Sequence, residues 1–498
     1  ARAAAQARLD ESLDEAAVAD VVRGVEQAVT GGVDQDLAER PLGGQVAARR
    51  DTAQVTVHLV RPLREAVGDG DDARLHRREP DYTQPPLEVP EEKKQALIDK
   101  LAEIYGPSTA EEWYPELERR LRVYYAYKTP EMIEEDEAFQ IENRFTEKDI
   151  ILITYGDLIV RKGEHPLKVL AEVLNEKVQF ATTIHILPFF PYSSDRGFSI
   201  KSYFEVDPNL GTWQDIDTLA TRFQLMFDGV INHISAKSHW FQEFLNGNPE
   251  YDDFFIRFST QSAISRDHIK LILRPRTTEL LTRFDTIDGP KLVWTTFSPD
   301  QVDLNYKNIK VLMRVVEVLL FYVRRGADII RLDAVTYLWS ELGTSCAHLR
   351  QTHQLIQLFR LILDIVSPQV ALITETNVPH KDNISYFGDG TNEAQMIYNF
   401  ALPPLTLHTF LRGDCTALAE WADSLEWISP TATYFNFLDS HDGIGLLPVK
   451  NLLSQEDVEF MIDKCREHGG MVSFKTDSDG DKSPYELNIT WYSALNND

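Results

Sequence analysis

The feature of this sequence that most restricts its fold is a repeated alternation of short apolar runs and amphipathic helical segments. The runs are rich in β-branched and aromatic residues, and each has the length of a strand. Seven of them occur, at 149–156, 182–190, 223–233, 327–335, 370–378, 394–402 and 431–442. Repeated strand–helix units predict a parallel sheet. We therefore predict an α/β fold class, a (β/α)8 TIM barrel, and keep a doubly wound open sheet as the alternative.

One long connection interrupts this alternation. About ninety residues separate the third and fourth runs, far more than a usual loop, and this length predicts an inserted subdomain at 234–308. The barrel then comprises 149–233 and 309–498, and a helical lead-in at 86–148 precedes it. A closed barrel of this kind needs eight strands. Because we count seven, we expect the barrel to be incomplete at the C-terminus, truncated before strand 8.

The beginning of the chain has a different composition. From Ala1 to Asp81 there is no Phe, Tyr, Trp or Ile. A segment without these residues buries little apolar surface, so it gains little to offset the entropy lost on ordering. We expect 1–85 to be a low-complexity or disordered segment and assign it no function.

Charge and cysteine content narrow the classes of partner. The formal net charge of -28 argues against nucleic acid and anionic membranes as partners. The three cysteines are Cys346, Cys415 and Cys465, and such a sparse, separated set fits a reducing compartment. No apolar run approaches the roughly 18 residues of a membrane span. We therefore expect a cytoplasmic protein, and the sequence leaves its oligomeric state open.

Polar residues gather where the predicted strands end. In a parallel barrel these ends lie on one rim, where catalytic groups are found. The residues that we expect to converge there are Asp228, Asn232, His233, Arg331, Asp333, Glu375, Asp439, His441 and Asp442, with Asp195, Arg196 and Phe198 from an earlier loop. We leave His185 as a core histidine.

Paired carboxyl groups at such a rim suit cleavage of a glycosidic bond, which needs one acid and one nucleophile or base. Arg331 would keep Asp333 ionised, because a nearby cation lowers the pKa of a carboxyl group. Glu375 follows an apolar strand, where desolvation would raise its pKa and suit it to acid catalysis. Two other interpretations remain open, a structural ion pair between Asp228 and Arg331 and a metal site.

Four short motifs, "DGVINH", "RLDAV", "ITET" and "LDSHD", together resemble those of the α-amylase superfamily, glycoside hydrolase family 13. The phrases "ILPFFPYSSDRGFS", "VWTTFSPDQVDLN" and "RLDAVTYLWSELGTSC" are more closely similar to its sucrose phosphorylase subfamily. This resemblance implies retaining transfer of a glucosyl group to phosphate. It implies no cofactor and no metal ion, and a barrel followed by a small C-terminal β domain.

The resemblance also implies roles for individual residues. Asp333 matches the nucleophile, Glu375 the general acid/base and Asp442 the stabiliser of the transition state. Residues at substrate-binding positions are Asp195, Phe198, His233, Phe297, Gln301, Arg331, Tyr337 and His441. Arg276 matches an arginine near the phosphate, an anion that suits a guanidinium group.

Two positions near the acceptor depart from the sucrose enzymes, Asn377 and Glu486. They are similar to the branch that acts on glucosylglycerate or glucosylglycerol. We expect phosphorolysis of 2-O-α-glucosylglycerate, with glucosylglycerol, sucrose 6-phosphate and sucrose as alternatives. The partners would be a small glucoside and inorganic phosphate. A hydrolase or transglucosylase would use the same three carboxyl groups, and a non-catalytic protein is the remaining alternative.

Overall fold

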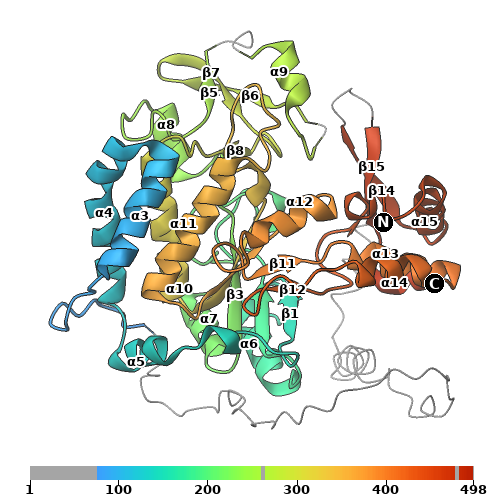
Figure 1. The fold of residues 1–498 in the computed structure, drawn as a ribbon, viewed down its shortest axis with the longest axis horizontal. Coiled ribbons are helices and arrows are strands. Elements are labelled where there is room, and N and C mark those ends of the chain that lie inside the picture. Colours follow the sequence, from blue (N-terminus) through green and yellow to red (C-terminus); the bar gives the residue numbers. More distant parts are fainter. Residues whose placement is uncertain (1–75, 260–263, 277, 477–481, 497–498) are drawn as a thin grey trace, which may run out of the picture.

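The computed structural model describes residues 76–259, 264–276, 278–476 and 482–496 (Figure 1). The segment 1–85 was predicted to be disordered, and its residues 1–75 lie outside the described residues. Within its remainder, the backbone N–H groups of Arg77 and Asp81 donate to the carbonyls of Tyr127 and Ala126. The predicted domain boundaries stay predictions.

The seven predicted strands form one sheet, in which every neighbouring pair is parallel. In sheet order they are β1 (Ile151–Thr154), β2 (Thr183–Ile186), β3 (Gln224–Gly229), β9 (Ala327–Leu332), β10 (Ala371–Thr374), β11 (Met396–Tyr398) and β12 (Thr433–Phe435). The order of the strands in the sheet follows their order in the chain. A doubly wound sheet instead reverses its order at an inner strand, so the barrel interpretation is favoured over the open sheet.

Both faces of this sheet are covered, which explains its nearly continuous apolar strands. All four residues of β2 and of β10 are buried. One apolar cluster lies between the sheet and the helices. A smaller cluster includes Met226, Ile373 and Tyr398, and its partly buried members include Phe145 and Phe437. The core therefore extends to both faces of the sheet.

Helices follow the strands where the spacing of apolar residues predicted them. These are α6 (Pro166–Lys177), α7 (Trp213–Ala220), α10 (Ile309–Arg324), α11 (Arg350–Val366) and α14 (Thr416–Asp423), preceded by α3 (Glu91–Tyr105) and α4 (Pro107–Tyr125). Figure 1 shows α3 and α4 beside α10 and α11. Here the Tyr105 hydroxyl donates to the carbonyl oxygen of Tyr306 at 2.8 Å. Helix α5 (Pro130–Ala138) lies in the predicted helical lead-in, whereas α12 (His380–Ile384) and α13 (Leu402–Arg412) were not predicted.

The long connection between β3 and β9 has its own small sheet, with order β5 (Arg257–Phe258), β7 (Gly289–Trp294) and β6 (Leu281–Thr286). Helices α8 (His239–Leu245) and α9 (Arg266–Leu271) belong to the same connection. At its base β4 (His233–Ser235) pairs antiparallel with β8 (Gln301–Asp303). The placement of His233 at the end of the third parallel strand was therefore wrong. β3 ends at Gly229, and His233 begins a separate short strand.

A second sheet follows β12 and was not predicted. Its order is β13 (Ile444–Gly445), β15 (Lys482–Asn488) and β14 (Met471–Thr476), all antiparallel. Helix α15 (Gln455–Glu467) contacts this sheet, and α16 (Trp491–Leu495) follows β15 and contacts α13. Leu446, Met461 and Leu487 belong to its separate apolar core. Asp439, His441 and Asp442 thus lie in the loop between β12 and β13, and not on a strand. In the part of the chain that the structure describes, no helix is long and apolar enough to span a bilayer.

Candidate active site

Arg331 is the centre of a buried group of charges at the ends of β3 and β9. Its Nη1 donates to Asp228 Oδ1 at 2.5 Å and to Asp333 Oδ1 at 2.8 Å. The parallel register places Asp228 opposite Arg331, and alternation along β9 turns Arg331 and Asp333 to one side. Asp228 also bonds His185 Nε2 at 2.8 Å. His185 is buried; its Nε2 contacts this carboxylate, and its Nδ1 has no hydrogen-bond partner among the described residues. Arg331 makes both the structural ion pair with Asp228 and the contact with Asp333.

The two carboxyl groups that share Arg331 differ in pKa. For Asp228, burial raises the pKa, but His185 and Arg331 outweigh it and lower the pKa to about 2. For Asp333, burial raises the pKa to about 8; Arg331 opposes this rise, and the charge of Glu375 adds to it. Arg331 does lower the pKa of Asp333, as expected, but the net shift is upward, so the expectation that Arg331 keeps Asp333 ionised was wrong. The contact exists, but the guanidinium is shared with Asp228 and burial dominates.

Glu375 follows β10, the strand next to β9, and lies beside Asp333. Its Oε2 accepts a hydrogen bond from the N–H of Ala334 at 3.2 Å. Ala334 has a φ of 50°, a left-handed conformation that few residues with a side chain adopt. Burial raises the pKa of Glu375, as its apolar strand predicted, and the Asp442 carboxylate adds to the rise. Two interacting carboxyl groups titrate as a pair, so their protons are lost in two steps that belong to the pair and not to either residue.

A loop from 191 to 201 and the short pair β4–β8 form one side of the site. The side-chain N–H of Gln301 donates to Asp195 Oδ2 at 3.0 Å. His233 Nε2 lies 3.0 Å from the carbonyl oxygen of Phe198, and its Nδ1 lies 3.3 Å from Asn232 Nδ2. These partners favour the neutral tautomer with the proton on Nε2, which donates to Phe198. Burial lowers the pKa of His233 to about 4, which favours the same neutral form.

Aromatic rings line the same side. The ring of Phe198 stacks on His441 with a centroid distance of 5.3 Å and an interplanar angle of 6°. The ring centroid of Phe297 lies 5.1 Å from that of His233 and 5.5 Å from that of Tyr337, which it meets edge to face. Such faces suit the apolar side of a sugar ring. Burial lowers the pKa of His441 to about 4, although the adjacent Asp442 raises it.

Asp442 is the most exposed of the three predicted catalytic residues, with a side chain that is 48% accessible. Its Oδ2 lies 3.4 Å from His441 Nε2. Its charge acts on Glu375 and on Glu486. The loop after β12 therefore carries Asp442 to the mouth of the same site.

Asn377 and Glu486, which are 109 positions apart in the chain, meet at the outer edge of the site. Asn377 Nδ2 donates to Glu486 Oε1 at 3.3 Å. Burial raises the pKa of Glu486 to about 7, Asp442 adds to the rise, and Arg276 opposes it. Arg276 itself is exposed. A carbon added at Gly445 would lie 2.8 Å from Asn377 Oδ1, so this glycine allows β13 to approach Asn377 closely.

Most of the predicted residues thus share one network of contacts at this rim. Arg276 is exposed, and Asp439 accepts a hydrogen bond from the N–H of Trp491 at 3.3 Å. The roles of these residues stay predictions. The sequence analysis missed two neighbours of that rim, Tyr155 and Asp157. The Arg196 guanidinium lies 4.4 Å from the ring centre of Tyr155 and pairs with Asp157 at 3.2 Å. Both neighbours follow β1 in "ITYGDL", so their position after a strand was the available signal.

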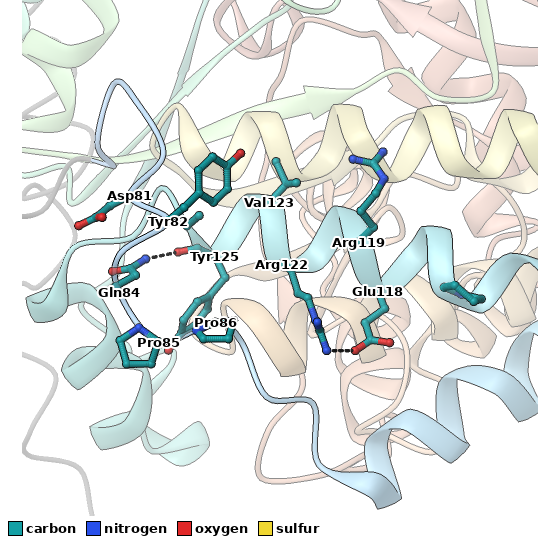
Figure 2. A pocket seen from close by; sticks show the side chains of 12 residues that line it. Asp81, Tyr82, Gln84, Pro85, Pro86, Glu118, Arg119, Arg122, Val123 and Tyr125 are labelled. Carbon is teal, nitrogen blue, oxygen red and sulfur yellow. Dashed lines mark hydrogen bonds and ion pairs between the residues drawn. The ribbon is translucent and has the colours of Figure 1, made fainter.

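A separate surface pocket of about 430 Å³ lies between residues 81–86 and α4 (Figure 2). Tyr82, Pro85 and Pro86 line it, and Gln84 donates to the carbonyl of Tyr125 across it. Its lining includes none of the predicted site residues, as far as the described chain extends. Over those same described ranges, no three His, Cys, Asp or Glu side chains gather to hold a metal ion.

Comparison with known proteins identifies the family. Residues 177–446 match the model of the alpha amylase catalytic domain. The chain is 48% identical to glucosylglycerate phosphorylase of Spirochaeta thermophila, over 80% of this chain and 67% of that one. It is 47% identical to glucosylglycerate phosphorylase of Allomeiothermus silvanus, over 82% of this chain and 70% of that one.

A solved structure supports the same assignment. Sucrose 6F-phosphate phosphorylase from Thermoanaerobacter thermosaccharolyticum superposes with a TM-score of 0.63 at 28% identity, over 71% of this chain and 72% of that chain. The parallel strands in chain order and the carboxyl groups at their ends agree with these matches. The chain therefore belongs to the α-amylase family, glycoside hydrolase family 13.

Proposed function

We propose that this protein is a retaining phosphorylase that converts 2-O-α-glucosylglycerate and phosphate to α-glucose 1-phosphate and glycerate. One observation carries the proposal. Two neighbouring carboxyl groups, Asp333 and Glu375, lie at adjacent strand ends in a chain that is 48% identical to a glucosylglycerate phosphorylase. Retaining cleavage needs such a pair, one as nucleophile and one as acid.

In the first step of the proposed reaction, an oxygen of Asp333 attacks the anomeric carbon while the bond to the glycerate oxygen breaks. Glu375 gives its proton to that oxygen, and a β-glucosyl ester on Asp333 remains. In the second step a phosphate oxygen attacks the same carbon, Glu375 takes the phosphate proton, and Asp333 leaves. The raised pKa values of both carboxyl groups support one proton shared by the pair. That proton resides on Glu375 when Asp333 attacks.

The remaining residues would bind and orient. Asp442 stabilises positive charge at the anomeric carbon, and Arg331 orients Asp333. The glucosyl unit would be held by Asp195, Phe198, His233, Phe297, Gln301, Tyr337 and His441. Neutral histidines accept or donate hydrogen bonds to hydroxyl groups without adding charge, which suits the lowered pKa values of His233 and His441.

The acceptor would lie beyond Glu375, between Asn377, Glu486 and Arg276. Arg276 supplies a positive charge for phosphate or for the carboxylate of glycerate. Glucosylglycerol is the second candidate substrate, since the contact of Asn377 with Glu486 offers polar groups for a neutral triol as well. We also propose a cytoplasmic location, which the three free cysteines support.

The test is phosphorolysis of 2-O-α-glucosylglycerate followed by detection of glucose 1-phosphate. Asp333→Asn should reduce the rate by at least about a thousandfold, because no glucosyl ester forms. Glu375→Gln should slow cleavage of the natural glucoside far more than that of an α-glucosyl fluoride, whose leaving group needs no proton. Release of free glucose in the presence of phosphate would favour a hydrolase. An active Asp333→Asn variant would overturn the assignment of the nucleophile.

A further inference from the structure

Asp300 lies one residue before β8, and its carboxylate accepts hydrogen bonds from four serines. Three of them, Ser193, Ser194 and Ser199, donate to Oδ2, with distances of 2.5 Å for Ser193 and 2.9 Å for Ser199. The fourth, Ser235, donates to Oδ1 at 3.3 Å. Ser199 and Ser235 are fully buried. The carboxylate is therefore occupied by the protein's own hydroxyl groups.

These serines come from two segments, and Asp300 joins both to a third. Ser193, Ser194 and Ser199 flank the part of the loop that carries Asp195 and Phe198. Ser235 ends β4, the strand that begins with His233. Asp300 is followed directly by Gln301, which bonds Asp195. One carboxylate thus connects the three segments that carry Asp195 and Phe198, His233, and Gln301.

The loop needs such a connection because its backbone is strained. Asp195 and Arg196 have φ values of 56° and 51°, and Gly197 follows with 114°. Two consecutive residues with side chains in the left-handed region are unfavourable and persist only where surrounding contacts hold them. The bonds from Ser193, Ser194 and Ser199 to Asp300 lie immediately before and after this strained stretch.

Charge strengthens the arrangement. Hydrogen bonds from hydroxyl groups to an ionised carboxylate are stronger than those between neutral groups. Burial raises the pKa of Asp300, but the hydroxyl groups of Ser193, Ser194 and Ser199 outweigh it, and the net pKa is below the usual value. Asp300 is therefore ionised at neutral pH.

We propose that Asp300 is a positioning residue for glucosyl binding, which acts through Asp195 and Phe198 by fixing the strained loop against β4 and β8. This proposal rests on the proposed function, because it assumes that Asp195 and Phe198 bind the glucosyl unit. Asp300 itself does not touch substrate in this mechanism, since its oxygens are occupied by Ser193, Ser194, Ser199 and Ser235. Its removal displaces the loop and leaves the catalytic carboxyl groups in place.

The experiment measures kcat and KM for phosphorolysis of 2-O-α-glucosylglycerate in single and double variants. Asp300→Ala should lower kcat/KM by about 10- to 100-fold, because small displacements of binding groups have effects of that size. Asp300→Asn keeps one carbonyl oxygen as an acceptor and should recover part of this loss. The surface variant Asp267→Ala, whose parent side chain is 93% exposed, is the matched control and should change nothing.

A double-mutant cycle separates positioning from a general loss of stability. Because Asp300 acts in part through Asp195, the variant with both residues changed to alanine should lose clearly less than the product of the two single losses. The part of the loss that acts through Phe198 should remain. The losses should multiply when Asp300→Ala is combined with Arg276→Ala, because Arg276 lies on the acceptor side. Independent losses at Asp300 and Asp195, or a kcat/KM of Asp300→Ala within twofold of wild type, would overturn the proposal.

Hydrogen exchange tests, without any substrate, whether Asp300 holds the loop at 193–200 in place. Amide groups at 193–200 should exchange at least about tenfold faster in Asp300→Ala than in wild type, and those of β10 should not change. Ser194→Ala, which removes one hydroxyl group, gives a milder variant if Asp300→Ala does not fold. Failure of wild type to make glucose 1-phosphate would refute the proposed function alone. Unchanged exchange at 193–200 in Asp300→Ala would refute the proposal that Asp300 holds this loop in place.

Discussion

Replacement of Arg331 by methionine would remove the only cation that contacts both Asp228 and Asp333 within the described part of the site. Arg331 is 1% exposed and Asp228 is fully buried. Breaking a buried ion pair by removing one partner costs about 3–5 kcal/mol, because the other charge is left unpaired. Arg331 Nε is buried without a hydrogen-bond partner, so part of the cost of burying the arginine disappears with it. We therefore expect the free energy of unfolding to fall by about 3 kcal/mol, at the lower end of that range.

Urea unfolding at pH 7 measures this fall in the free energy of unfolding, and two further variants test its cause. Arg331→Met combined with Asp228→Asn should be more stable than Arg331→Met alone, because Asp228 then keeps only His185 as a partner and its buried charge is neutralised. Arg283→Met is the surface control. Arg283 is 69% exposed and lies 3.4 Å from Asp285, so its loss should cost no more than about 1 kcal/mol. A fall of less than about 1 kcal/mol in Arg331→Met, or no recovery in the double variant, would refute the argument that unpaired buried charge sets the cost.

Two other predictions concern pH and the acceptor. Burial lowers the pKa of His233 to about 4 in the folded protein, whereas an unperturbed histidine has a pKa of about 6.5. The unfolded chain therefore binds a proton at His233 more readily than the folded protein does. The stability that neutral His233 contributes is present above pH 6.5 and is lost as the pH falls toward 4. Unfolding curves between pH 7 and 4 should show a shallower decline for His233→Gln, and an unchanged slope would contradict the assignment. Gly445→Ala should shift the preference among glycerate, glycerol and fructose in the same direction as Asn377→Ala and Glu486→Gln, because the added carbon would displace Asn377. Rates of reverse synthesis from glucose 1-phosphate measure this preference, and unchanged ratios in all three variants would show that these residues do not select the acceptor.

The sequence alone indicated where each parallel strand begins, because an apolar run of strand length followed by a helical repeat is a local pattern. The ends of the third and seventh strands were predicted too late in the chain. The same local logic placed Arg331 and Asp333 on one side of β9 and Glu375 after β10. Side chains two positions apart in a strand point the same way, whatever the rest of the chain does. The motifs around these residues then indicated the family, which the comparisons confirm.

Only the tertiary structure decided how distant segments meet. The antiparallel strands β13, β14 and β15 are short and mixed in polarity, so no local pattern predicted the sheet that brings Glu486 to Asn377. His233 looked like the end of a long apolar run, but its pairing with Asp303 made it part of a new strand. Asp300 and its four serines gave no signal either, because they are separated in sequence and meet only through folding.

The pKa of Asp333 also depends partly on features visible in the sequence and partly on the tertiary structure. The neighbouring Arg331 is visible in the sequence, and a nearby cation by itself lowers the pKa of a carboxyl group. The net rise comes from burial and from the charge of Glu375, and it persists because Asp228 shares the guanidinium of Arg331. Desolvation and charge–charge interactions depend on distances between elements that are far apart in the chain. The sequence determined which groups are present, and the packing of β3, β9 and β10 decided the direction in which the pKa of each group shifts.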